Sequence, residues 1–156
     1  MAESYEKLQQ ARKEASAPVG LGDGGGYGNT WVQKITNNGN HVVHFVNPYH
    51  GTTTGDIQPG ETDDKDAVQG YIPYWGESQK YEFHYKNETL DKQIVVAIKD
   101  LGEWLLSFAQ DGIEHITDIA YLRPASYFPI EIIVKYNGFE IYDIDNNERK
   151  GGLFFW

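Results

Sequence analysis

The sequence contains no cysteine. This absence excludes disulfides, thiol nucleophiles and cysteine-ligated zinc or iron–sulfur sites. There is also no apolar run of about 18 residues, and the N-terminus lacks the basic-then-apolar pattern of a secretory signal. We therefore expect no transmembrane segment, and either a cytoplasmic location or export by a route that needs no signal peptide.

Positive charge is scarce. Lysine and arginine total 13 against 23 aspartate and glutamate residues, a formal net charge of −10, and no basic run exceeds two residues. A net negative charge of this size repels nucleic-acid phosphates and anionic lipid headgroups. Nucleic acid is therefore not an expected partner, and any membrane binding would need aromatic insertion or headgroup recognition.

Large apolar side chains are plentiful. The 156 residues are 40% hydrophobic and 14% aromatic, which suits one packed core. From Trp31 onward, short aromatic or β-branched segments alternate with polar residues and are separated by turn residues. This pattern predicts an all-β domain, specifically an antiparallel β-sandwich, with jelly-roll-like and barrel-like forms as alternatives.

The chain divides into three expected parts. Residues 1–16 are rich in helix formers and predict a short N-terminal helix. Residues 17–30 form a glycine-rich linker, and residues 31–156 form the β-sandwich domain. The glycine run follows a helix and precedes a strand, the reverse of the order in a phosphate-binding loop, so a nucleotide site is not expected.

Turn residues predict three hairpins in this domain and about eight to ten strands in total. Pro73 places its segment at a sheet edge or a bulge. Residues 145–152 are expected to form a polar loop before a final strand or plug at Leu153–Trp156. The predicted hairpins pair Trp31–Thr36 with His41–Val46, Ile94–Ile98 with Trp104–Ala109, and Ile130–Tyr136 with Phe139–Asp143 through a type I′ turn at Asn137-Gly138.

Aromatic residues form the leading candidate site. Tyrosine and tryptophan combine an apolar ring with a polar group and suit sugar rings or lipid headgroups. The favoured function is a non-catalytic, lectin-like or membrane-directed toxin-like module that binds carbohydrate or a lipid headgroup. A core-filling or edge-covering role for the same rings stays open. The proposed ligand-binding residues are Tyr49, His50, Tyr71, Tyr74 and Trp75.

Two other functions remain open. His44, Glu82 and His84 could converge from neighbouring strands in a small metal-dependent or hydrolytic enzyme. Alternatively, the N-terminal helix and tether could reach a protein partner while the β-domain acts as a scaffold. No Gly-x-Ser-x-Gly elbow or His-Glu-x-x-His array is present, so no catalytic residue is assigned.

No cofactor or metal ligand is assigned either, although calcium is kept as an alternative at oxygen-rich loops. Two acidic clusters supply such loops: the first is Glu61, Asp63, Asp64 and Asp66, and the second is Asp143, Asp145, Asn147 and Glu148. The second cluster departs from an EF-hand because Glu148 stands where glycine is needed and Phe154 where glutamate is needed.

Overall fold

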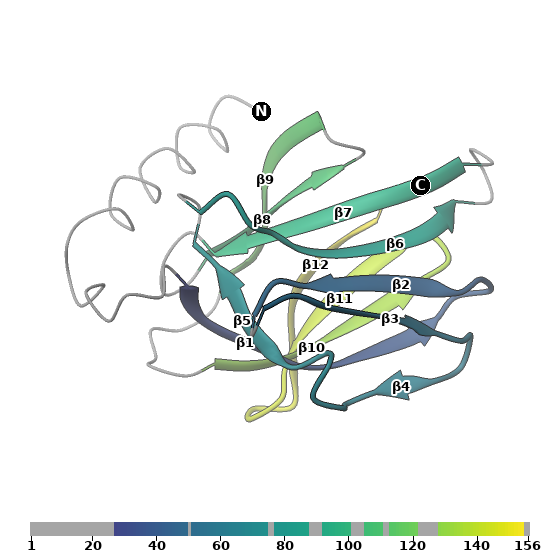
Figure 1. The fold of residues 1–156 in the computed structure, drawn as a ribbon, viewed down its shortest axis with the longest axis horizontal. Coiled ribbons are helices and arrows are strands. Elements are labelled where there is room, and N and C mark those ends of the chain that lie inside the picture. The colour runs from purple at the N-terminus through teal and green to yellow at the C-terminus, as the bar shows by residue number, and fades with distance from the viewer. Residues whose placement is uncertain are drawn as a thin grey trace.

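The computed structural model describes residues 27–49, 51–74, 77–87, 92–100, 105–110, 113–121 and 128–154. These residues form twelve strands and confirm the all-β prediction (Figure 1). The predicted helix at 1–16 lies outside them. No helix in this part of the chain is long and apolar enough to cross a membrane. The strands are β1 Tyr27–Asn38, β2 Val43–Asn47, β3 Thr53–Ile57, β4 Thr62–Asp63, β5 Gly70–Pro73, β6 Tyr81–Asn87, β7 Lys92–Asp100, β8 Leu105–Gln110, β9 Ile113–Tyr121, β10 Phe128–Lys135, β11 Gly138–Asp143 and β12 Glu148–Phe154.

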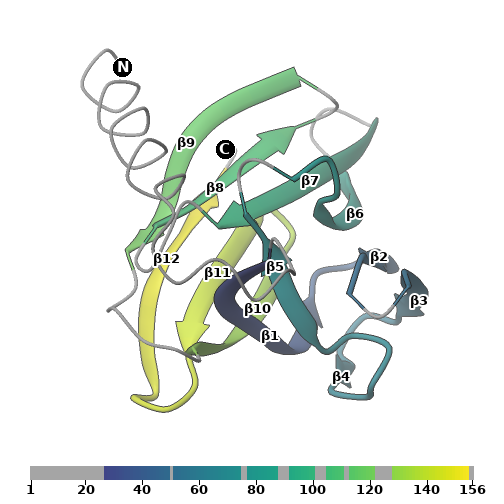
Figure 2. The ribbon, with the colours of Figure 1, turned by 60° about the vertical axis from the view of Figure 1, so that its left-hand side comes forward.

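The strands follow one hydrogen-bonded path, β3-β2-β6-β7-β8-β9-β12-β11-β10-β1-β4, with β5 also paired to β1. Figure 2 shows this path from β2 and β3 on the right, over β7, β8 and β9 at the top, to β12 on the left. An isolated bridge between Tyr74 and Asp100 brings the chain after β5 back to β7. The Thr30 amide donates to Asp100 Oδ2 at 3.3 Å, which ties β1 to the same point.

The core lies between strands that are far apart along this path. Phe83 of β6 meets Phe139 of β11 edge-on, with ring centroids 5.2 Å apart. On β6, Tyr81 and Phe83 are fully buried, whereas Glu82 and His84 lie on the outer face, because successive side chains of a strand point to opposite faces. The Tyr81 hydroxyl donates to the Val68 carbonyl at 2.6 Å. Burial raises the pKa of Tyr81 well above its usual value, and the nearby Asp63 charge adds to this effect.

The predicted hairpin between Trp31–Thr36 and His41–Val46 is wrong. β1 pairs with β4, β5 and β10, whereas β2 pairs with β3 and β6. Asn37 gives the reason: its side-chain amide donates to the carbonyls of His41 and Ile57, and its Oδ1 accepts from the Gly39 amide. These bonds, from a fully buried side chain, hold the 38–42 segment as a crossover between the two parts of the path.

The pairing is also not antiparallel throughout, because β1 runs parallel to β10 from Thr30–Phe128 to Asn38–Lys135. A parallel pair needs a long connection, which the intervening strands supply. The other strand pairs between described strands are antiparallel.

The other two predicted hairpins are confirmed as β7–β8 and β10–β11. In β10–β11 the closing pair is Lys135 and Gly138, so the turn residues are Tyr136 and Asn137. Neither is among the described residues with positive φ, which excludes the predicted type I′ turn. The chain also enters β1 at Tyr27, ahead of the predicted start at Trp31.

The predicted polar loop at 145–152 is too long, since β12 begins at Glu148. Its charged residues 148–150 lie within β12, where Arg149 Nε donates to Glu140 Oε1 of β11 at 3.2 Å. Its glycines allow close packing: a Cβ at Gly151 would lie 1.9 Å from the Ile119 carbonyl oxygen of β9. Gly151 and Ala120 are the described pair that joins β12 to β9.

Candidate functional site

Three aromatic side chains meet beside β1 and β5. Trp31 of β1 and Tyr71 of β5 are direct cross-strand partners, and their ring centroids lie 4.9 Å apart. Tyr49, which follows β2, packs edge-on against both, at 5.4 Å from Trp31 and 5.6 Å from Tyr71. We call Trp31, Tyr49 and Tyr71 the aromatic cluster. All three side chains are half-buried, so the cluster has a solvent-facing part.

Asn47 fixes Tyr49 in this cluster. It ends β2 and is 1% exposed. Its Nδ2 donates to the Ala67 and Gln69 carbonyls at 3.0 and 2.9 Å, and its Oδ1 accepts from the Tyr49 amide at 3.0 Å. A single buried amide therefore joins the segment that carries Tyr49 to the segment that leads into β5.

Gly70 is required for the same junction. A Cβ at this position would lie 2.6 Å from both Asn47 Oδ1 and Tyr49 Cβ. The strand that carries Tyr71 can pass beneath Tyr49 only because residue 70 has no side chain.

The loop after Tyr49 is conformationally unusual. Gly51 and Thr52 have φ values of 83° and 70°. A β-branched residue rarely adopts positive φ, and such strain concentrates at functional sites. The aromatic cluster therefore adjoins a strained loop.

Of the predicted ligand-binding residues, Tyr49 and Tyr71 come together in the aromatic cluster. Tyr74 is half-buried and bridges to Asp100. His50 and Trp75 lie outside the described residues. The sequence interpretation missed Trp31, which joins the cluster only through the pairing of β1 with β5. The alternation in β1 was a usable signal: Val32 faces the core, so Trp31 faces outward.

A second group lies on the outer face of β3, β2 and β6. His44 and His84 are direct cross-strand partners with ring centroids 5.4 Å apart. His44 Nδ1 lies 2.8 Å from Asp56 Oδ1, and His84 Nε2 lies 3.1 Å from Glu82 Oε1. The structure thus brings together His44, Glu82 and His84 as predicted, and adds Asp56. We call these four residues the histidine face.

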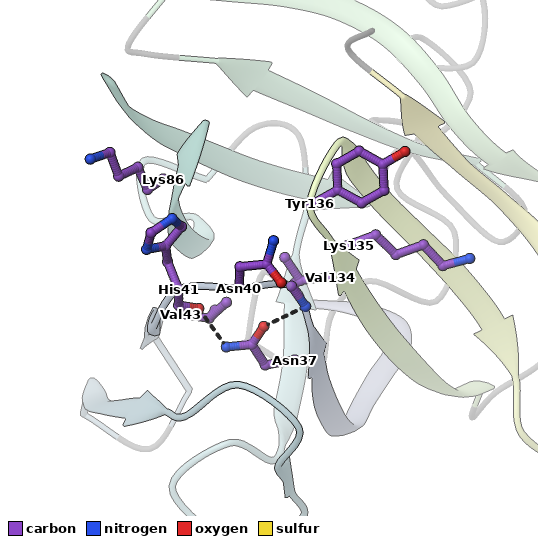
Figure 3. A pocket seen from close by; sticks show the side chains of 9 residues that line it. Asn37, Asn40, His41, Val43, Lys86, Val134, Lys135 and Tyr136 are labelled. Carbon is purple, nitrogen blue, oxygen red and sulfur yellow. Dashed lines mark hydrogen bonds between the residues drawn. The ribbon is translucent and has the colours of Figure 1, made fainter. Parts of the chain in front are cut away.

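A small open pocket lies beside the β10–β11 turn (Figure 3). Two of its polar side chains already have partners: Asn37 bonds the His41 carbonyl and the Gly39 amide, and Lys135 Nζ pairs with Glu140 at 3.1 Å. Figure 3 shows the side chains of Lys86 and Lys135 extending to opposite sides, away from Asn37. We assign no ligand to this pocket.

In each of the two acidic clusters, one carboxylate accepts hydrogen bonds from residues two or three positions further along the chain. Asp143 is fully buried and accepts from the amide and the side chain of Asn146, while Asp63 accepts from the Lys65 amide. Within the described residues, no group of three or more histidine and acidic side chains is placed so that all of them could ligate one metal ion. Calcium binding at these loops stays a prediction.

Comparison with known proteins adds no family or relative: no protein-family model and no curated protein matches the chain.

Proposed function

We propose that this protein is a non-catalytic recognition domain that binds carbohydrate through the aromatic cluster. The observation that carries the proposal is the meeting of Trp31, Tyr49 and Tyr71 as half-buried rings at mutual distances of 4.9 to 5.6 Å. Such rings offer an apolar surface for the C–H face of a sugar, together with indole and phenol groups for its hydroxyls.

Hydrogen bonds and close packing support the aromatic cluster from below. The hydrogen bonds of Asn47 and the close approach at Gly70 hold Tyr49 against Tyr71 before any ligand arrives. Preorganised side chains lose less conformational entropy on binding, which favours recognition of a weakly binding ligand such as a sugar. The strained loop at Gly51 and Thr52 supports a binding role for this part of the molecule.

A lipid headgroup is the competing ligand. The net charge of −10 opposes approach to anionic membranes. We therefore favour the neutral, polyhydroxylated ligand and make lipid binding an outcome of the test.

The test is a glycan array followed by calorimetric titration with the best glycan. Trp31→Ala is expected to weaken binding by about tenfold or more, because it removes the largest of the three rings. Tyr136→Ala removes a 54% exposed aromatic outside the cluster and should leave affinity unchanged. Circular dichroism of each variant checks the fold.

Three outcomes count against the proposal. One is the absence of saturable binding to any glycan, and another is equal loss of affinity in the Trp31 and Tyr136 variants. The third is saturable pelleting with phosphatidylcholine vesicles without any glycan binding, which would identify a lipid headgroup as the ligand.

For the architecture, we propose a β-sandwich that is partly closed at one end. The packing of Phe83 on Phe139 supports two facing halves, and the Tyr74–Asp100 bridge supports the closure. The small metal-dependent or hydrolytic enzyme remains a second candidate, favoured by the gathering of His44, Glu82 and His84 on one face. The scaffold with an N-terminal tether stays a prediction, because residues 1–26 lie outside the described chain.

A further inference from the structure

The histidine face has the geometry of a metal site with two imidazole ligands. His44 and His84 lie opposite each other on β2 and β6, so both side chains project from the same sheet face. Their rings are accessible, with side-chain exposures of 41% for His44 and 25% for His84.

The distance between the rings fits a shared ion. A zinc-bound imidazole nitrogen lies about 2.0–2.1 Å from the metal, which places the ring centroid roughly 3.2 Å away. Two such rings at a tetrahedral angle are separated by about 5.2 Å. The observed separation is 5.4 Å. The centroid separation therefore matches that of two imidazoles bound to one tetrahedral ion.

The carboxylates prepare both nitrogens for this role. An ionised carboxylate only accepts hydrogen bonds, so His44 Nδ1 must carry the proton that faces Asp56. By the same reasoning, His84 Nε2 carries the proton that faces Glu82. In the neutral rings, the lone pairs then lie on His44 Nε2 and His84 Nδ1. A carboxylate that orients a metal-binding histidine through its other nitrogen is the usual outer partner in such sites.

We propose that His44 and His84 bind a borderline divalent transition metal, such as Zn²⁺ or Cu²⁺, with water completing the coordination. Imidazole nitrogen selects these ions over Mg²⁺ and Ca²⁺, which prefer oxygen. Asp56 and Glu82 act as positioning residues. The site is separate from the aromatic cluster, and metal binding here requires neither carbohydrate recognition nor catalytic turnover.

The first test is calorimetric titration of the full chain with Zn²⁺ after treatment with chelator. We expect saturable binding of one ion per chain, which His44→Ala and His84→Ala each weaken by well over tenfold. Asp56→Asn and Glu82→Gln keep both ligands and should weaken binding by about 10–100-fold. The control is His41→Ala, which removes a histidine outside this face and should leave the affinity unchanged.

A second readout separates ligation from a general structural effect. Electron paramagnetic resonance of the Cu²⁺ form should show coupling to two imidazole nitrogens, falling to one in His84→Ala. The proposal is overturned if Zn²⁺ shows no saturable binding, if His41→Ala weakens binding as much as His84→Ala, or if Ca²⁺ competes equally with Zn²⁺.

Discussion

Replacing Asn47 with alanine should be among the most destabilising single changes in the described chain. The side chain is 1% exposed and makes three hydrogen bonds of 2.9–3.0 Å. Asn47→Ala removes all three and also leaves a small cavity.

The magnitude follows from what each partner loses. The Ala67 carbonyl keeps a second donor, the Thr53 hydroxyl at 2.5 Å, so the loss of the Asn47 donor costs little free energy there. The Gln69 carbonyl and the Tyr49 amide lose the partner that Asn47 supplies. An unsatisfied group costs about 1–3 kcal/mol when buried, and these two segments are half-buried, so we expect a loss of about 3 kcal/mol in unfolding free energy.

Urea unfolding measures this loss as a lower midpoint with an unchanged slope. Asn40→Ala, at an exposed asparagine, serves as the control and should change stability by no more than about 0.5 kcal/mol. If Asn47→Ala lies within about 1 kcal/mol of the unchanged protein, the assigned role of this amide in joining the two segments is refuted.

Three further changes test other parts of the structure. Because the pKa of Tyr81 is raised in the folded state, the unfolded state releases this proton first, so stability should fall as pH rises above about 10. Tyr81→Phe should cost about 1–2 kcal/mol at neutral pH but make alkaline unfolding, followed by circular dichroism, less steep. Gly151→Ala should lower the free energy of unfolding, measured with urea, by about 1–3 kcal/mol through its clash with the Ile119 carbonyl, whereas Gly39→Ala, whose nearest contact would be 3.3 Å, should lower it less. Gly70→Ala should weaken glycan binding as well as stability, and unchanged affinity would show that Tyr49 need not be held against Tyr71.

The sequence predicted the features that depend on neighbouring residues. The alternation of apolar and polar residues from Trp31 onward predicted the all-β domain, and the Asn137-Gly138 signal located the β10–β11 hairpin. Both signals arise within one or two strands, where spacing and turn chemistry determine the result.

Features that depend on contacts between residues far apart in the sequence could not be predicted from local patterns. Asn37-Asn38-Gly39-Asn40 resembles a hairpin turn, but the Asn37 side chain bonds Ile57 and supports a crossover instead. The aromatic cluster was predicted only in part, because Trp31 reaches Tyr71 through the β1–β5 pairing. His44 and His84 were both candidates. The sequence did not predict that they face each other across β2 and β6, or that Asp56 of β3 contacts His44.

The parallel pairing of β1 with β10 also bears on how the chain folds. Thr30 pairs with Phe128, so β1 cannot pair with β10 until most of the described chain has been synthesised. Closing so long a loop is entropically costly and slows folding. During synthesis, Val32 and Ile35 have no β10 partner until Ile130 and Ile132 emerge, and an apolar strand that lacks a partner favours aggregation during this interval.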